Sequence, residues 1–361
     1  MDYAVILAGG TGKRLWPLSR QRRPKQILKL LDGQTLLRKC FERLKAVFDF
    51  RNILVLANAD YADLIRENLN ELPEENVIAE PAVRDTAAAI GLASAVLQKY
   101  DSSAVMAVVT ADQILEPAEA FESAMRAALA FVRENPQGLI TFGIKPTFPS
   151  TQLGYIYFGD EVCRQGGKAV YRINAFKEKP DLHTAQEYLE SGQYRWNSGL
   201  FVWRCGTILQ QLAQHLPACI EPLRHIQADW GTAKQQQTLA EWFPKMPKIS
   251  IDYAVMEKSD QVYGISLDCR WLDMGSFTAL ADVIESDEND NIIVAEHSEL
   301  MDCRNMIIIT EDKDHLIAAI GLENMVIAHS KDATLVCPIS QNERIKELLE
   351  NVRKHKDGKY L

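Results

Sequence analysis

The sequence predicts an α/β protein with a mixed, mostly parallel sheet, followed by a small β domain. Two observations lead to this prediction. Short apolar runs rich in β-branched residues alternate with segments of helical periodicity up to about residue 142. Beyond the polar stretch 286–291, only short β-type runs and one closing helical segment remain. Alternating strands and helices indicate repeated βα units, which build parallel sheets with right-handed crossovers.

Each element of the first part is predicted by its own run of residues. The expected strands are residues 3–7, 53–57, 77–79, 104–109 and 139–142. The expected helices are residues 36–47, 61–69, 86–100 and 118–133, and the alanine-rich third helix follows Asp85, a residue type that can cap it. Ligands of such sheets bind at the carboxyl ends of the strands. We therefore expect binding loops that begin at Ala8, Glu80 and Thr110.

The pattern changes after the βα units, which predicts two domains. Residues 147–203 show mixed strands and turns, as expected for an insertion over the sheet, and lead on to the segments 251–258 and 271–277. We predict a first domain of residues 1–285 and a small C-terminal β domain of residues 290–361. The expected strands of the small domain are residues 292–295, 306–310, 316–320, 325–328 and 334–336, before a helix at 342–354. Their repeat is too irregular to predict a solenoid, and a short left-handed β-helix is one candidate form.

The composition is that of an ordinary globular protein. The chain has 361 residues, 47% of them hydrophobic and 25% charged, a length typical of about two domains. The N-terminus has no basic region, and its apolar run, residues 4–8, is too short for a signal peptide or a membrane span. The seven cysteines stand singly, as is typical of reduced thiols, so we expect a cytoplasmic protein without a membrane partner. The seven histidines show no zinc-binding spacing, so no zinc site is predicted.

The charge is distributed unevenly along the chain. A net charge of −9 argues against nucleic acid as the main partner, because binding to a phosphate backbone requires a basic face. One segment nevertheless carries seven cations and no acid: Lys13, Arg14, Arg20, Arg22, Arg23, Lys25 and Lys29. At this point two interpretations stay open, a solvated basic loop or a binding site for a small polyanion.

A glycine-rich turn, residues 8–12, follows the first expected strand directly. Glycines there let backbone N–H groups approach phosphate oxygens closely. Two common phosphate-binding loops are excluded. A P-loop would need glycine in place of Leu7 and serine or threonine in place of Arg14, and a dinucleotide-binding fingerprint from Gly10 would need glycine or alanine in place of Leu15.

Residues 7–26, LAGGTGKRLWPLSRQRRPKQ, resemble the N-terminal signature of the sugar nucleotidyltransferases, and the WPLSR and PKQ parts resemble the mannose-1-phosphate guanylyltransferases among them. Further blocks resemble that family in order along nearly the whole chain: 80–86, 110–112, 154–155, 176–180, 196–201, 250–257 and 271–276. The resemblance implies a Rossmann-like fold of the nucleotide-diphospho-sugar transferase type and a catalytic domain at residues 1–285. It also implies the reaction of GTP with α-D-mannose 1-phosphate to give GDP-mannose and diphosphate.

The resemblance also implies roles for charged residues. A sugar phosphate attacks the α-phosphorus of GTP in line, and such transfers depend on cations that stabilise phosphate charge. By resemblance, Arg14 contacts the leaving β- and γ-phosphates, and Lys25 contacts the α-phosphate and the incoming phosphate. Asp112, the third expected catalytic residue, would share one Mg²⁺ with Asp273, since this hard ion takes carboxylate oxygens. The structural alternatives are solvated cations, and aspartates that cap helices or form turns.

The remaining expected site residues concern the nucleotide and the sugar. Glu80 and Arg84 together offer an acceptor and donors that complement the pairing edge of guanine, although Arg84 could bind phosphate instead or simply pair with Glu80. The expected nucleotide-binding residues are Leu7, Ala8, Gly9, Gly10, Thr11, Gly12, Glu80, Arg84 and Thr86. By resemblance, the sugar-phosphate-binding residues are Gly154, Glu178, Lys179 and Asn197, for which a salt-bridged surface turn is the alternative.

Four departures from the family pattern leave the base and the sugar open. Gln113, Asp85, Ala88 and Phe277 stand where the family usually has His, Asn, Pro and Trp. One alternative is a nucleotidyltransferase for another sugar 1-phosphate, such as a heptose. A second is a non-catalytic regulatory subunit that senses a nucleotide sugar. The resemblance further implies a homodimer formed through the small β domain.

Overall fold

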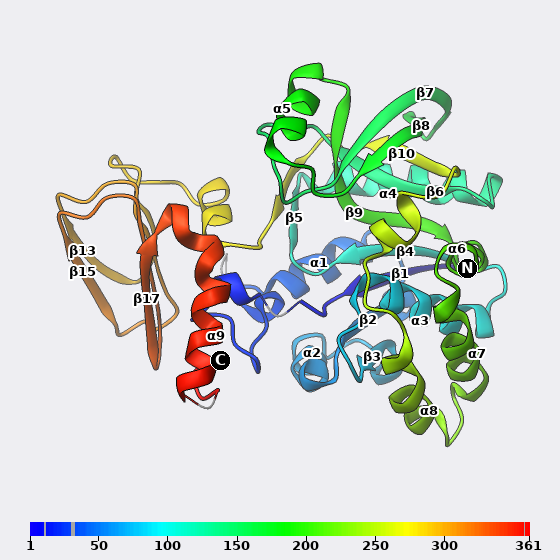
Figure 1. The fold of residues 1–361 in the computed structure, drawn as a ribbon, viewed down its shortest axis with the longest axis horizontal. Helices are drawn as coiled ribbons and strands as arrows, with labels where there is room; N and C mark the ends of the chain where they lie inside the picture. The colour runs from blue at the N-terminus through cyan, green and yellow to red at the C-terminus, as the bar shows by residue number, and fades with distance from the viewer. Residues whose placement is uncertain (11, 30–32, 357) are drawn as a thin grey trace. The chain divides into compact units, whose positions relative to one another are not determined.

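The computed structural model describes residues 1–10, 12–29, 33–356 and 358–361, and Figure 1 shows their fold. The chain divides into two compact units. The first unit comprises residues 1–9, 40–111 and 115–271, and the second comprises residues 10–39, 112–114 and 272–361. These units are discontinuous in sequence, so they are not the two continuous domains predicted above, and the predicted boundaries near residues 285–290 stay a prediction.

A nine-stranded sheet forms the centre of the first unit. Its strand order is β3-β2-β1-β4-β9-β6-β10-β8-β7. β8 and β9 run opposite to the other strands, so the predicted mixed, mostly parallel sheet is confirmed. The strands are β1 Asp2–Leu7, β2 Ile53–Asn58, β3 Val77–Glu80, β4 Val105–Thr110, β6 Leu139–Ile144, β7 Tyr155–Gln165, β8 Lys168–Lys177, β9 Tyr194–Arg204 and β10 Val262–Ser266.

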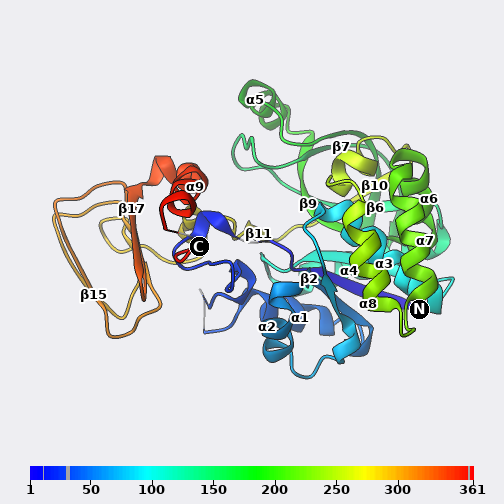
Figure 2. The same ribbon diagram turned by 60° about the horizontal axis from the view of Figure 1, so that its bottom comes forward.

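Helices cover both faces of this sheet, because successive residues of the central strands point to opposite, equally buried faces. Val5 and Val108 pack on one face with apolar residues of α3, α6, α7 and α8, the first three of which lie together in Figure 2. Ile6 and Val55 on the other face are fully buried as well. The helices are α1 Leu36–Lys45, α2 Ala62–Asn68, α3 Asp85–Tyr100, α4 Ala118–Glu134, α5 Leu182–Ser191, α6 Cys205–His215, α7 Ile220–Asp229 and α8 Gln235–Trp242.

The predicted binding edge exists. Leu7 lies beside Leu56 and Thr110, and Asn58 lies beside Glu80, so the carboxyl ends of β1, β2, β3 and β4 meet at one edge of the sheet. One detail of the prediction is wrong. Asp85 does not precede α3 but is its first residue, and its Oδ1 accepts a hydrogen bond of 2.7 Å from the backbone N of Thr86.

Short parallel strands characterise the second unit. Ile292 lies beside Ile307 and Ile307 beside Val326, and a second set pairs His297 with Leu316. Parallel strands joined by short turns are the arrangement of a β-helix, so the predicted β-rich C-terminal region is confirmed. Its elements are β12 Ile292–Val294, β13 His297–Met301, β14 Ile307–Thr310, β15 Leu316–Ile320, β16 Met325–Ser330, β17 Ala333–Pro338 and α9 Ile345–Lys356, and the sequence did not predict β13.

Residues 13–28 are held inside the second unit by the C-terminal part of the chain. Leu15 and Leu18 are buried in one apolar cluster with residues of β14, β16 and α9. Trp16 Nε1 donates a hydrogen bond of 2.6 Å to the carbonyl oxygen of Tyr360. Arg20 donates to the same carbonyl and to Asp332 Oδ1, at 2.5 and 2.6 Å.

None of the helices that the structure describes has both the length and the apolar character that a bilayer span requires.

The first unit contains a tight packing contact that can be tested. A Cβ atom added to Gly264 of β10 would lie 2.6 Å from Cε1 of Phe158 and 2.7 Å from Cδ1 of Ile173. We expect Gly264→Ala to displace that ring and lower the free energy of unfolding by about 1–3 kcal/mol, measured by urea unfolding.

The matched control is Gly206→Ala in α6, where an added Cβ meets only Nε2 of Gln98 at 3.0 Å. Because alanine favours a helix more than glycine does, this variant should be unchanged or more stable by up to about 1 kcal/mol. Equal stability of Gly264→Ala and the unsubstituted protein would contradict the contact.

Candidate functional site

Three of the predicted charged side chains meet in the second unit. The ammonium group of Lys25 forms an ion pair with Asp112, and its Nζ lies 3.8 Å from Oδ1 of Asp273. The Lys25 side chain is only 13% exposed. The backbone links the same segments, because Met274 N donates a hydrogen bond of 3.2 Å to the carbonyl oxygen of Asp112. The two aspartates that were predicted to share one cation are therefore neighbours.

Local structure explains how these residues meet. Lys25 opens the short 3₁₀ helix Lys25–Ile27 directly after Pro24. Asp112 lies between β4 and the short strand β5, Gln113–Glu116, while Asp273 ends the strand β11, Arg270–Asp273. β5 and β11 pair as a two-stranded sheet. This pairing places the residue before β5 close to the end of β11.

The glycine-rich turn lies against the stem of Lys25. Gly12 has φ 66°, and a Cβ atom added there would lie 2.5 Å from Cβ of Lys25, while one added to Gly10 would lie 3.5 Å from its Cε. The carbonyl oxygen of Gly12 accepts a hydrogen bond of 2.5 Å from Ser19 Oγ. These glycines therefore allow the turn to approach the lysine. Thr11, an expected nucleotide-binding residue, lies outside the described residues.

Arg14 belongs to the same cluster. A Cβ atom added to Gly275 would lie 3.0 Å from Arg14 Nη2 and 3.4 Å from Asp273 Oδ2. Nη1 of Arg14 donates a hydrogen bond of 2.7 Å to Oε1 of Glu343, just before α9. The sequence does not predict Glu343, because nothing in its local pattern indicates a partner more than three hundred residues away.

The electrostatics of the cluster keep Lys25 charged. Burial alone would lower the pKa of its ammonium group, but the nearby carboxylates of Asp112 and Asp273 outweigh that effect and raise the pKa above its ordinary value. A permanent ammonium and a guanidinium can bind phosphate oxygens. Two carboxylates that contact the same cation can hold a divalent metal ion.

Other cations of the basic segment serve the structure of the second unit. Arg20 pairs with Asp332 at 2.6 Å, Arg23 pairs with Glu311, and Lys13 Nζ lies 3.6 Å from Glu350 Oε1. The interpretation of this segment as a solvated loop is therefore wrong for Arg20, which is 15% exposed, whereas Arg23 and Lys13 are paired but stay 43% and 42% exposed.

The expected sugar-phosphate-binding residues also meet, in the first unit. A Cβ atom added to Gly154 would collide with Oε2 of Glu178 and lie 3.3 Å from Cβ of Asn197. Asn197 N donates a hydrogen bond of 2.8 Å to the carbonyl oxygen of Gly154. Lys179, whose φ is 49°, donates from Nζ to Oε1 of Glu178 at 2.5 Å. The structure therefore brings all four predicted residues together.

A carboxylate without a predicted role joins this group. Asn197 Nδ2 donates a hydrogen bond of 2.9 Å to Oδ1 of Asp252, the first residue of the π-helix Asp252–Met256. Burial, and next the charge of Glu178, raise the pKa of Asp252 to about 7. Thr86, an expected nucleotide-binding residue, accepts a hydrogen bond of 2.8 Å at Oγ1 from the backbone N of Ile251 and so positions this segment. π-helical turns often mark functional sites, but the sequence does not reveal them.

Glu80 lies at the carboxyl edge of the sheet, where a Cβ atom added to Gly9 would lie 3.5 Å from its Oε2. Burial raises the pKa of Glu80 to about 7. Among the described residues, no ion pair joins Glu80 to Arg84, so the suggested pairing is not observed. The buried Nε of Arg84 has no hydrogen-bond partner among the described residues either. The sheet already uses backbone groups of the first turn, because Ala8 N donates to Leu56 O and Leu7 O accepts from Ala111 N.

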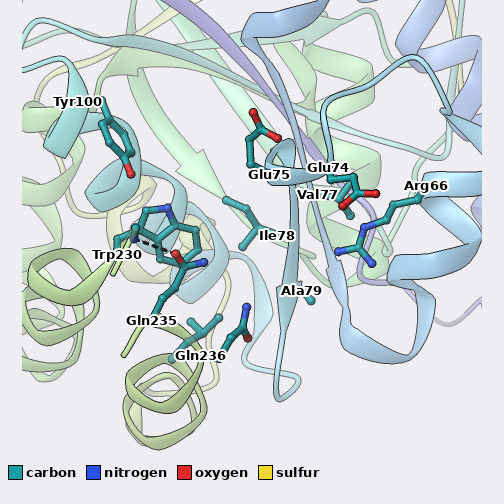
Figure 3. Close-up of a pocket in the computed structure, with 12 residues that line it drawn as sticks. Arg66, Glu74, Glu75, Val77, Ile78, Ala79, Tyr100, Trp230, Gln235 and Gln236 are labelled. Carbon is teal, nitrogen blue, oxygen red and sulfur yellow. Dashed lines mark hydrogen bonds between the residues drawn. The ribbon is translucent and has the colours of Figure 1, made fainter. Parts of the chain in front are cut away.

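One pocket of the first unit contains none of the predicted residues. It measures about 350 Å³ and lies beside β3, where Ile78 contributes to its lining (Figure 3). Glu74 and Glu75 provide two carboxylates against the single guanidinium of Arg66. Because this balance disfavours phosphate, we assign no substrate to the pocket.

Comparisons with known proteins show which family the chain resembles. Residues 3–290 match the family described as nucleotidyl transferase, and residues 282–352 match a MannoseP isomerase/GMP-like beta-helix domain. A mannose-1-phosphate guanylyltransferase of Klebsiella pneumoniae is 35% identical over 366 residues, which cover 100% of this chain and 76% of the relative.

Two solved structures are similar along most of the chain. A crystal structure described as mannose-1-phosphate geranyltransferase from Thermus thermophilus has a TM-score of 0.86 at 32% identity, and the match covers 98% of this chain and 99% of the other. A crystal structure of mannose-6-phosphate isomerase from Helicobacter pylori has a TM-score of 0.61 at 26% identity, and the match covers 76% of this chain and 100% of the other.

The raised pKa of Glu80 predicts how stability depends on pH. The folded protein holds this proton up to about pH 7, whereas the unfolded chain loses it near pH 4.5. Between these values the folded state binds the extra proton, so this group makes the free energy of unfolding fall as pH rises, by up to about 1.4 kcal/mol per pH unit. Glu80→Gln removes this contribution. We expect urea unfolding to show the variant gaining stability relative to the unsubstituted protein as pH rises from 4.5 to 7.

The control for this measurement is Glu74→Gln, which changes an exposed carboxylate of the same unit. Its stability difference should not follow the same trend. A difference for Glu80→Gln that stays constant with pH would show that the Glu80 carboxyl is not buried in this way.

Proposed function

Because this chain belongs to the nucleotidyl transferase family, we propose that it transfers the guanylyl group of GTP to α-D-mannose 1-phosphate, giving GDP-mannose and diphosphate. The observation that carries this proposal is the meeting of Lys25, Asp112 and Asp273 in one cluster next to the glycine-rich turn. Such a cluster supplies a cation that can bind phosphate oxygens and two carboxylates that can hold a divalent ion, both of which a reaction between two phosphates requires. The choice of mannose and guanine is supported by similarity to the mannose-1-phosphate guanylyltransferase of Klebsiella pneumoniae.

The chemistry requires control of charge more than a protein nucleophile. A phosphate oxygen of mannose 1-phosphate forms a bond to the α-phosphorus of GTP, and the bond from that phosphorus to the β-phosphate bridging oxygen breaks. The attacking oxygen is already anionic, so no side chain has to remove a proton from it. We propose that Lys25 holds the α-phosphate and the incoming phosphate, and that Arg14 stabilises the leaving diphosphate. The raised pKa of Lys25 supports this role, because it keeps the ammonium charged.

The residues of the cluster also fit a divalent metal ion. Asp112 and Asp273 contact the same cation, the Lys25 ammonium, and carboxylate oxygens are the ligands that Mg²⁺ prefers. We therefore propose that these two aspartates hold Mg²⁺. When bound, the ion supplies positive charge to phosphate oxygens.

Residues of the first unit are proposed to select the sugar and the base. Glu178 and Lys179 offer an acceptor and a donor for sugar hydroxyls or phosphate, and Asn197 is held in position through both of its side-chain polar atoms, by Asp252 and by Thr141 Oγ1 at 2.8 Å. Glu80 is proposed to accept hydrogen bonds from guanine. These contacts favour its ionised form, so guanine binding should lower its pKa from about 7.

Three further proposals concern the molecule as a whole. We propose a catalytic domain of residues 1–285 and a β domain of residues 290–361, in keeping with the limits of the two family models.

We propose a homodimer, because Met301 and Ile320 lie side by side on β13 and β15 and are 59% and 69% exposed. The sedimentation coefficient distinguishes this dimer from a monomer. The cytoplasmic location also stays a proposal, supported by seven cysteines that are all free thiols.

The proposed activity is tested with a panel of nucleoside triphosphates and sugar 1-phosphates in the presence of Mg²⁺. We expect diphosphate release to be fastest with GTP and mannose 1-phosphate, because Glu80 accepts from the donors of guanine. Turnover only with a heptose or another sugar 1-phosphate would overturn the choice of mannose. Tight GDP-mannose binding without any turnover would indicate the regulatory subunit instead, and mannose 6-phosphate serves as the control for isomerase activity.

Lys25 should matter both for turnover and for the stability of the second unit, because its ammonium pairs with Asp112 and Asp273. We expect Lys25→Ala to lower the rate of GDP-mannose formation by about 100-fold or more, the loss typical of removing one group that stabilises transition-state charge. Steady-state kinetics measures this loss, and circular dichroism checks that the fold persists. The control is Lys29→Ala, an exposed cation of the same basic segment, which should retain most of the rate. Near-normal turnover of Lys25→Ala would refute the assignment.

A further inference from the structure

A second group of polar side chains lies on β16 and in the turn after β14 in the second unit. The ligand atoms of Asp312, His315 and His329 all lie within 4.8 Å of one another. None of the three has a role in the proposed transfer reaction. We propose that Asp312, His315 and His329 form a binding site for one divalent transition-metal ion such as Zn²⁺, separate from the Asp112 and Asp273 pair.

Two neighbouring parallel strands hold the three residues. His329 stands on β16 beside Thr310, the last residue of β14, and Asp312 and His315 lie in the turn that follows β14. Hydrogen bonds fix that turn. Asp312 N donates to Thr310 Oγ1 at 3.0 Å, and Asp314 N donates to Asp312 Oδ1 at 3.1 Å. The carboxylate is therefore oriented by backbone that is itself anchored to the strand next to His329.

The two imidazoles lie against each other. Their rings lie parallel, with centroids 3.7 Å apart and an interplanar angle of 8°. Nδ1 of His329 is hydrogen-bonded to Thr334 Oγ1 at 2.9 Å. A hydrogen bond at one ring nitrogen fixes the orientation of a metal-binding histidine and leaves the other nitrogen to bind the ion.

The set of ligands indicates the class of metal. Two imidazoles and one carboxylate suit zinc and its neighbours, whereas Mg²⁺ and Ca²⁺ take oxygen ligands almost exclusively. Ligand atoms on one tetrahedral zinc lie about 3.3 Å apart. Ring nitrogens bind a metal in the plane of the ring, so one imidazole has to rotate out of the parallel stack for both to reach one ion. Neighbouring charges are engaged elsewhere, because Glu311 pairs with Arg23 and Lys313 Nζ lies 3.7 Å from Glu296 Oε2.

The sequence could not indicate this group. The spacing of Asp312 and His315 matches no familiar zinc motif, and His329 follows only on the next turn of the chain. The three residues become neighbours because β14 and β16 pair in parallel. The prediction that the histidines form no zinc site was based on spacing along the chain, and that spacing says nothing of residues on stacked strands.

The test is a titration of the full chain with Co²⁺ and then Zn²⁺ in excess Mg²⁺, which fills carboxylate sites but does not compete for imidazole. We expect one equivalent of Co²⁺ to produce visible absorption bands, which one equivalent of Zn²⁺ abolishes. Calorimetry of Zn²⁺ binding should show a single strong site. Thr334→Val should weaken binding by about 10-fold, since it removes only the hydrogen bond to His329, and loss of either histidine should weaken it further.

The variants His315→Ala and His329→Ala test the ligands, and His297→Ala, an exposed histidine of β13, is the matched control that should bind normally. Bound Zn²⁺ should also raise the unfolding temperature of the unsubstituted protein and of His297→Ala, but not that of His315→Ala. If His329→Ala fails to fold, His315→Ala still decides the question. Unchanged Zn²⁺ affinity in His315→Ala, or no stoichiometric binding by the unsubstituted chain, would overturn the proposal. Neither result depends on guanylyl transfer.

Discussion

The pairing of one largely buried ammonium, that of Lys25, with Asp112 and Asp273 is the interaction on which the second unit depends. It joins three segments that are far apart in the sequence: the segment after the glycine-rich turn, the residue before β5 and the end of β11. A buried charge without a partner costs several kcal/mol, so each member of the cluster is held by the others. The same charges are those that phosphates and a divalent ion require. In the proposed function, stability without substrate and chemistry with substrate therefore draw on one set of groups.

The C-terminal region completes the surroundings of this cluster. Arg14 pairs with Glu343, Arg20 with Asp332 and Arg23 with Glu311, so acids from after residue 310 hold cations from before residue 24. Apolar residues of both segments share one buried cluster. The β-rich region therefore stabilises the conformation of the cation-rich segment, residues 13–29. This dependence explains why the compact units are discontinuous in sequence.

Local patterns predicted most strands of both units, whereas contacts between distant segments hid how the strands of the second unit stack. Strands β1, β2, β3, β4 and β6 appear where alternation of apolar runs predicted them, because each reflects its own residues. The β-helix-like stacking could not be read from local pattern. Its neighbours Ile292, Ile307 and Val326 are separated by unequal numbers of residues along the chain. Asp252 and Glu343 were missed for the same reason. Their importance lies in the side chains that they contact, Asn197 and Arg14, and no local periodicity records such contacts.

In the proposed function, burial prepares Glu80 and Asp252 for the neutral hydrogen-bond donors of a ligand. A carboxyl group whose pKa lies near 7 can be present in either form at physiological pH, whereas an exposed one would be ionised. Burial favours the protonated, neutral form of both groups while no ligand is bound. A ligand that offers N–H or O–H donors then favours the ionised form, and the proton is released to solvent. Part of the binding free energy is spent on that ionisation, so a ligand without matching donors would gain little from these residues. Burial thus favours selectivity for hydrogen-bonding ligands over affinity for any ligand of suitable shape.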